Sequence, residues 1–215
     1  MDTLREFVEN EVPKEIFTST LKDSYFLQNA CRNKNITSEI LQYIFLKFPS
    51  VASVTTDETE WFDETEYLAY PVHIMCRDVD CPDFVISALI NEAPLALKQF
   101  AIIELGLNNL GHDYEETGLG RANIPGTPLH YYLERESNIN LAIVKELIGA
   151  YPQAISSYSE AAEYRPKGVT PIYCLLSNPN IGEMEDVLQY FLETNGSEMR
   201  KTGGVNDFTP IHIAI

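Results

Sequence analysis

The sequence predicts an all-α fold, an α-solenoid of about four to five stacked helix-turn-helix repeats. Similar segments recur at 25–49, 70–94, 127–152 and 170–195, and a fifth begins at residue 209. In the four complete segments, the fourth residue stands 21, 21, 22 and 22 residues before the closing Pro or Asn. The fourth residues of successive segments are instead 45, 57, 43 and 39 residues apart. A unit of constant length with connectors of variable length is typical of repeat proteins.

Each complete segment carries the pattern of two helices. The first is short, and several segments open it with Thr-Pro, where Thr can cap the helix and Pro suits its first position. The second is longer and amphipathic, as in Ile143, Val144, Leu147 and Ile148, which share one helical face. The helices that this pattern predicts are 26–34 and 37–48, 71–77 and 82–93, 128–135 and 140–151, and 171–177 and 183–194.

The same pattern divides the chain into consecutive units. The first unit is a predicted helical cap with its acidic residues outward, and two of the connectors are long loops. The units are the N-terminal cap 1–23, repeat 1 at 24–56, an acidic loop 57–66, repeat 2 at 67–99, an insertion loop 100–125, repeat 3 at 126–158, repeat 4 at 159–204, and a truncated repeat 5 at 205–215.

The motifs that open the segments are Thr-Pro-Leu-His at 127–130 and Thr-Pro-Ile-His at 209–212, with partial copies at 71–73 and 170–172. They resemble the ankyrin repeat signature, and the chain is similar to a divergent ankyrin repeat protein of long period. In that family the Thr hydroxyl and the His ring tie adjacent repeats together by hydrogen bonds. The resemblance therefore implies an inter-repeat structural role for His73, Thr127, His130, Thr170, Thr209 and His212.

The chain also departs from that family. The usual period is 33 residues, the Gly that separates the two helices is missing, and Pro replaces the usual turn after the second helix, as at Pro94 and Pro152. A different type of α-solenoid fits the same periodicity.

Composition narrows the classes of partner. The formal net charge is −17, which argues against binding to nucleic acid or to an anionic membrane, since both need Lys and Arg. A basic protein or peptide is the natural partner by charge, although an acidic surface also serves solubility alone. The first residues lack the apolar stretch of a secretory signal and are too acidic for a transit peptide, which predicts a cytoplasmic or nuclear location. The four cysteines are too few for a disulfide scaffold.

Candidate partner-binding residues fall in two places. Trp61 and Phe62 stand within the acidic loop, where aromatic side chains suit an interface, or else fold back onto the repeats. The other candidates belong to the first helices, whose equivalent positions would line the concave face of a solenoid. These are Ile74, Arg77, Tyr131, Tyr132 and Glu134.

The sequence contains no nucleophile motif, phosphate loop or metal-ligand set, so no catalytic, cofactor-binding or metal-binding residue is predicted. We therefore expect a non-catalytic protein-binding scaffold that uses the concave face of its repeats. The alternative is an accessory or regulatory repeat segment of a larger multidomain protein, for example an enzyme whose catalytic domain lies outside this chain.

The last residues suggest a further expectation. The sequence ends within the first helix of repeat 5, so Ile211, Ile213 and Ile215 would lack a covering second helix, and Val187 and Phe191 would be exposed. Because an uncapped end of a solenoid exposes apolar surface, we expect either a longer natural chain or self-association through this end.

Overall fold

The computed structural model describes residues 27, 30–31, 33, 35–48, 50–55, 69–101, 125–135, 139–159, 168–200 and 209–213. The predicted cap 1–23, the acidic loop 57–66 with Trp61 and Phe62, most of the insertion loop 100–125, and Ile215 lie outside the described residues. The α-helices are α4 (Ser38–Lys47), α5 (Pro71–Arg77), α6 (Asp83–Glu92), α7 (Pro128–Leu133), α8 (Leu141–Ala150), α9 (Pro171–Leu176), α10 (Glu185–Asn195) and α11 (Pro210–Ile213). Short 3-10 helices lie between them: η1 (Val51–Ser53), η2 (Ala96–Lys98), η5 (Pro152–Ser156), η6 (Ile181–Glu183) and η7 (Gly196–Arg200).

The all-α prediction is confirmed. Throughout the described ranges the regular structure is helical, and extended pairing is limited to isolated bridge residues, Ala69 and the pair Ala101 and Gly126. Each predicted second helix is present within two residues of its expected ends. The first helix of repeat 2 has its predicted bounds, whereas α7 and α9 end one or two residues early. None of the described helices is long and apolar enough to cross a membrane.

Local chemistry explains where these helices begin and end. Pro71, Pro128 and Pro171 each occupy a first helical position, where the missing N–H costs nothing. The side chains of Thr37 and Asn140 accept hydrogen bonds from backbone N–H groups of α4 and α8, at 3.3 Å and 2.9 Å respectively.

The second helices of repeats 1, 2 and 3 end in the same way. Phe48, Ala93 and Tyr151 leave the helical region, with φ and ψ of −135° and 66°, −129° and 58°, and −140° and 84°. Each precedes a proline, whose ring disfavours the α conformation in the residue before it. The closing proline that the repeats share is therefore the signal that ends the helix.

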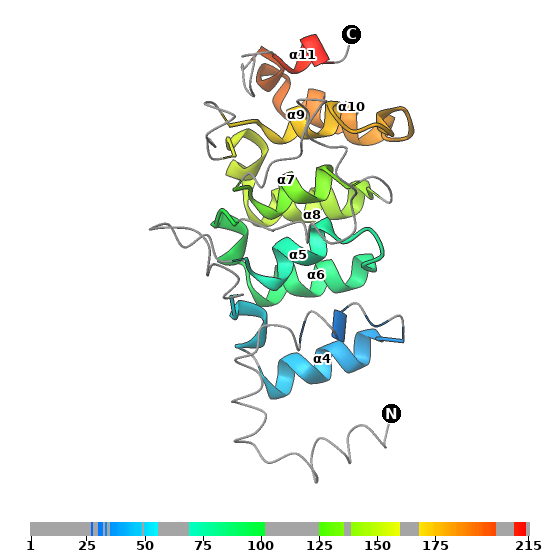
Figure 1. Cartoon of the computed structure of the whole chain (residues 1–215), viewed down its shortest axis with the longest axis vertical. Coiled ribbons are helices and arrows are strands. Elements are labelled where there is room, and N and C mark those ends of the chain that lie inside the picture. The colour runs from blue at the N-terminus through cyan, green and yellow to red at the C-terminus, as the bar shows by residue number, and fades with distance from the viewer. Residues whose placement is uncertain are drawn as a thin grey trace, which may run out of the picture.

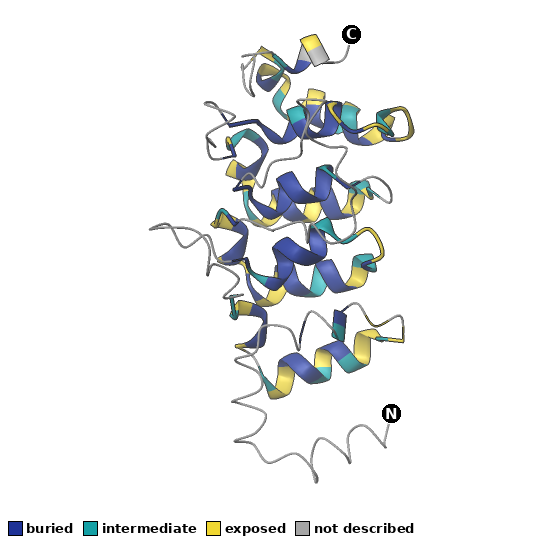
Figure 2. Ribbon diagram, viewed as in Figure 1, coloured by how far each residue is buried: buried dark blue, intermediate teal, exposed yellow. Residues whose placement is uncertain are grey.

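The helix pairs follow one another along the long axis of the molecule (Figure 1). The first helices pack in sequence, α5 against α7 and α7 against α9, while α4, α6, α8 and α10 form a second layer beside them. In α5 the residues up to Cys76 are buried, and in α7 every residue is buried. Helices α6, α8 and α10 each expose one face (Figure 2). The core thus lies between the two layers and around the first helices.

A close backbone approach precedes α9. The backbone N–H of Ser159 donates to the Val169 carbonyl at 2.8 Å, and the Val169 N–H donates to the Ser159 hydroxyl at 2.8 Å. A Cβ atom added to Gly168 would stand 1.6 Å from the Ser159 carbonyl oxygen. Only glycine fits at position 168 without a shift of the backbone.

Two glycine substitutions test this packing. Gly168→Ala should lower the free energy of unfolding by about 3 kcal/mol, because the backbone pair must separate. The matched control is Gly149→Ala on the exposed face of α8, where no described atom lies within 4 Å of the new Cβ. It should raise stability by about 0.5–1 kcal/mol through helix propensity. Urea unfolding measures both, and equal effects of the two substitutions would contradict the close approach.

Candidate functional site

His130 joins repeat 3 to the segment that leads into repeat 4. Its Nδ1 accepts from the Thr127 backbone N–H at 3.2 Å and lies 2.8 Å from the Thr127 hydroxyl. Because Nδ1 is an acceptor, the ring proton resides on Nε2, which donates to the Val169 carbonyl at 3.1 Å. The neutral ring thus caps its own helix and ties it to the next repeat.

The same arrangement recurs along the chain. His73 Nδ1 accepts from the Tyr70 N–H at 3.3 Å, and its Nε2 lies 3.0 Å from the Gln99 carbonyl in the connector to repeat 3. His212 Nδ1 accepts from the Thr209 N–H at 3.2 Å and lies 2.7 Å from the Thr209 hydroxyl. His73 and His130 therefore reach from their own helices to the Gln99 and Val169 carbonyls. Thr127, Thr209 and His212 make hydrogen bonds at the start of their own helices.

Burial keeps two of these rings neutral. His73 and His130 are 0% and 2% exposed. Loss of hydration lowers the pKa of each imidazole to about 4, although hydrogen bonds to backbone groups partly oppose the shift. A second proton on either ring would also remove the acceptor that the N–H at the start of the helix requires.

Repeat 4 breaks this pattern. Its fourth position is Tyr173, which has no ring nitrogen to accept from Thr170. Among the side chains that the structure describes, the Thr170 hydroxyl is buried without a hydrogen-bond partner. The predicted structural role of Thr170 is therefore limited to its backbone at the start of α9.

A second set of bonds runs in the opposite direction, from the turn within one repeat to the repeat before it. Asn178 Oδ1 accepts from the Asn180 N–H at 3.0 Å, and its Nδ2 donates to the Leu133 carbonyl at 3.1 Å and to the Arg135 carbonyl. Asn33 and Asp78 form the same local turn, at 2.9 Å and 3.1 Å. All three stand five residues after the fourth position of their repeat.

Arg135 occupies this position in repeat 3 and behaves differently. Its side chain is 2% exposed, its guanidinium lies 4.9 Å from the centre of the Tyr132 ring, and its Nη2 donates to the Cys81 carbonyl at 3.4 Å. Within the described structure its Nε and Nη1 have no hydrogen-bond partner. Arg135 is therefore an inter-repeat core residue and not a surface cation.

Three candidates for partner contact prove to be core residues. Ile74, Tyr131 and Tyr132 are 7%, 3% and 0% exposed. The centre of the Tyr131 ring lies 6.2 Å from the centre of the His73 ring and 5.7 Å from the Arg77 guanidinium carbon. The Tyr131 hydroxyl donates to the Ala101 carbonyl. The Tyr132 hydroxyl accepts from the Asn140 N–H at 2.9 Å. The expectation that these three side chains form an exposed contact surface is wrong, because they are buried in the inter-repeat core.

The other two candidates from the first helices are half-buried. Arg77 ends α5, and Glu134 follows α7, where its Oε1 accepts from the Cys174 thiol at 3.5 Å. Most of the first-helix residues that the sequence predicted for partner contact thus pack within or between the repeats.

The expectation that Val187 and Phe191 are exposed near the C-terminal end is also wrong. Val187 and Phe191 are 0% and 1% exposed, and η7 packs against α10 and α11. These side chains are covered within the chain, so they do not provide the surface on which the expected self-association rested.

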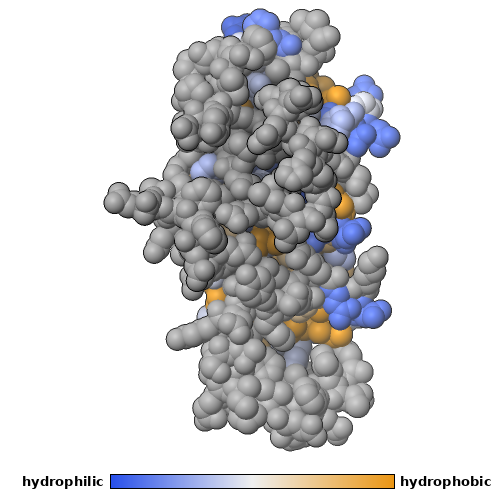
Figure 3. Space-filling view, viewed as in Figure 1, coloured by the Kyte–Doolittle hydropathy of each residue, from blue (hydrophilic) through white to orange (hydrophobic). Residues whose placement is uncertain are grey.

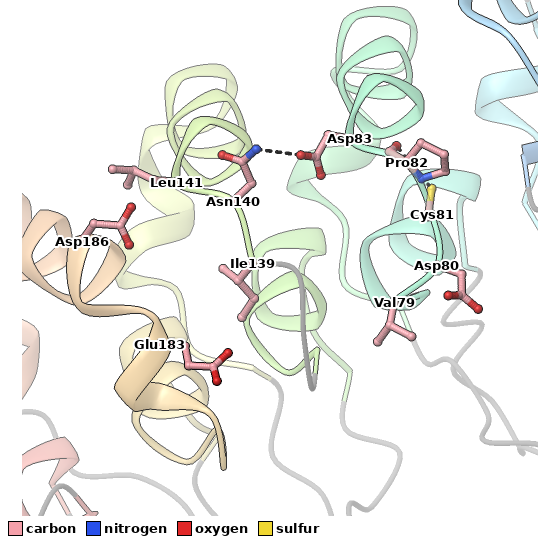
Figure 4. A pocket seen from close by; sticks show the side chains of 10 residues that line it. All are labelled: Val79, Asp80, Cys81, Pro82, Asp83, Ile139, Asn140, Leu141, Glu183 and Asp186. Carbon is pink, nitrogen blue, oxygen red and sulfur yellow. Dashed lines mark hydrogen bonds between the residues drawn. The ribbon is translucent and has the colours of Figure 1, made fainter.

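A hollow in the described structure lies elsewhere, along the turns that join the paired helices. It has a volume of about 620 Å³ and is lined by residues of three consecutive repeats. Asn140 and Asp83 point toward each other across it, with the Asn140 amide donating to the Asp83 carboxylate at 2.7 Å (Figure 4). Hydrophilic side chains gather at these turns along one edge of the molecule (Figure 3). We call this hollow the turn groove; it is lined by Val79, Asp80, Cys81, Pro82, Asp83, Ile139, Asn140, Leu141, Glu183 and Asp186.

Sequence reasoning missed the turn groove because it searched the first helices. The available signal was the recurrence of carboxylates in the turns of repeats 2 and 4, at Asp80, Asp83, Glu183 and Asp186. Only the packing of repeats 2, 3 and 4 brings these turns to one edge.

The cysteines and the two buried histidines lie in the interior of the described structure. All four cysteines, each within the described ranges, are buried free thiols, and burial raises the pKa of Cys31 and Cys76 to about 12. No group of three His, Cys, Asp or Glu among the described residues is arranged to hold a metal ion.

The chain matches no protein-family model, and no curated protein sequence matches it.

A pair of Thr substitutions separates the two kinds of repeat. Thr127→Val removes the hydroxyl that bonds to His130 and should lower the free energy of unfolding by about 1 kcal/mol. Thr170→Val removes a buried hydroxyl without a partner and should leave stability unchanged or raise it by about 1 kcal/mol. Urea unfolding at neutral pH compares the two. The same loss for both substitutions would show that the Thr127 hydroxyl contributes nothing specific.

The buried histidines also predict a dependence of stability on pH. In the unfolded chain each binds a proton below pH about 6.5, whereas the folded chain resists protonation down to about 4. The contribution of the two neutral histidines to the free energy of unfolding should therefore be complete above pH 6.5. It should fall as the pH drops toward 4, by about 1.4 kcal/mol per pH unit for each histidine.

A comparison of His130→Gln with the wild type separates the effect of His130 from that of the carboxylates, because the carboxylates titrate in both proteins. Below pH 6 the unfolding free energy of the variant should fall less steeply with decreasing pH than that of the wild type, by about one proton. Chemical unfolding at several pH values measures the slope. Identical slopes for the two proteins would rule out the buried neutral state of His130.

Proposed function

We propose that this chain is a non-catalytic protein-binding scaffold built as an α-solenoid of divergent ankyrin-like repeats. Two features support the solenoid. Each helix pair contacts its neighbours in sequence order, as α5 with α7 and α7 with α9. His73 and His130 bond to the connectors that lead to the next repeat. A protein that extends by adding similar units presents a long surface made from equivalent positions, and such surfaces commonly bind other proteins.

The observation that carries this proposal is the turn groove, which crosses three consecutive repeats. No single repeat contains it, because its walls come from the α5–α6 turn, the start of α8, and the η6–α10 region. Burial of α7 along its whole length argues that the binding surface lies at this edge and not over the first helices. We therefore place partner binding at the turns between paired helices.

Site-specific cross-linking tests the scaffold function. A photo-reactive amino acid replaces Asp80 or Glu183, which are exposed side chains on opposite walls of the turn groove. The matched control replaces Glu92, which is exposed at the end of α6 outside the groove. In extracts of the source cell, both groove positions should cross-link to the same protein, and the control position should not.

Mass spectrometry identifies the adducts, and their absence from the groove positions under irradiation would count against the scaffold function at this edge. Equal cross-linking from position 92 would show that the binding surface is not the groove.

A further inference from the structure

The turn groove has three parts along the row of repeats. Asp80 and Asp83 form one wall, and Glu183 and Asp186 form the opposite wall. Ile139 and Leu141 lie between the two walls (Figure 4). Val79, 37% exposed, adds apolar surface beside the first wall. The groove therefore has a pair of carboxylates at each end and, between them, the half-buried side chains of Ile139 and Leu141 beside the Asn140 amide.

Helix stability accounts for only part of this arrangement. Asp83 and Asp186 stand in the first turns of α6 and α10, where a negative charge is favourable against the helix dipole. Asp80 and Glu183 precede those helices and are exposed. None of the ten described residues that line the groove is basic. Arg135 is buried, Arg77 lies 5.7 Å from the centre of the Tyr131 ring, and Lys145 lies 5.2 Å from the centre of the Tyr190 ring.

The spacing of the two acidic walls sets the length of an occupant. Helices of neighbouring repeats pack about 8–10 Å apart, so walls from repeats 2 and 4 are separated by roughly 20 Å. An extended chain rises about 3.3 Å per residue and covers that distance in about six residues. Since successive side chains of a strand alternate in direction, residues about six apart face the same side.

The row of turns favours an extended occupant. The residues that line the groove come from short turns of three successive repeats. A single strand that lies along these turns keeps its side chains against Ile139 and Leu141.

We propose that the turn groove binds an extended segment of a partner protein that carries two basic residues about six positions apart, with apolar residues between them. The basic side chains pair with the Asp80 and Glu183 walls, and an apolar side chain contacts Ile139 and Leu141. This inference rests on the proposed scaffold function and specifies the partner that the same groove takes.

A peptide titration tests the inference. The probe is a fluorescein-labelled peptide with two lysines about six residues apart, leucines between them on the same side, and serines elsewhere. The spacing control has the same composition, with the lysines about two residues apart, so that they still face the same side. Fluorescence anisotropy with the full chain should show at least fivefold tighter binding of the probe than of the spacing control, because only the probe reaches both walls.

Two double variants locate the binding. Asp80→Asn with Glu183→Gln should weaken binding of the probe about five- to tenfold. Glu92→Gln with Glu146→Gln makes the same change in net charge at exposed positions outside the groove, on α6 and α8. This control pair should change binding by less than about twofold. Far-ultraviolet circular dichroism confirms that both double variants remain helical.

Several results would overturn the inference. Equal weakening by the two double variants would show that the net charge alone attracts the peptide. Equal binding of the probe and the spacing control would contradict the proposed separation of the two acidic walls. Spermine is a polyamine without leucine side chains. If its binding depends on Asp80 and Glu183 as strongly as binding of the probe does, the proposed contact with Ile139 and Leu141 is contradicted. If the cross-linked partner keeps its affinity for the Asp80→Asn, Glu183→Gln variant, the basic-segment inference fails while the scaffold function stands. If no partner is cross-linked at all, the scaffold function fails first.

Discussion

The structure depends on a buried imidazole that must remain neutral. His130 accepts at Nδ1 from the start of its own helix and donates from Nε2 to the connector of the next repeat. A buried polar ring is stable only when both nitrogens are satisfied, since an unpaired buried donor or acceptor costs about 1–3 kcal/mol. One side chain thus defines the beginning of a helix and the position of the neighbouring repeat at the same time.

A second set of contacts opposes the first in direction and completes the junction. Asn178 reaches back to the carbonyls of Leu133 and Arg135, and Arg135 reaches back to the carbonyl of Cys81. Histidines bond forward at one end of the first helices, while turn residues bond backward at the other end. Because both ends of α5 and α7 are tied, the turns of three repeats align along one edge and line the turn groove.

The burial of Tyr131 and Tyr132 changes where function belongs in this protein. Aromatic side chains are frequent anchors at interfaces, but they also supply large apolar area to a core and need a partner for their hydroxyl groups. Here Ala101 and Asn140 provide backbone partners, so both rings are structural. The exposed chemistry is left to short polar turns, where Asp80 and Glu183 are free of a core role.

The sequence alone determined the periodic part of this protein. Thr127, Pro128 and His130 specify the start of a helix by local hydrogen bonding and a restricted φ, and the prolines after Phe48, Ala93 and Tyr151 specify where the second helices end. These signals act within a few residues, so they can be interpreted without a structure. The burial of Arg135 and Tyr131, the unpaired hydroxyl of Thr170, and the turn groove were decided by tertiary structure. Each depends on which residues of a neighbouring repeat lie opposite, and residues separated by tens of positions become neighbours only when the repeats pack.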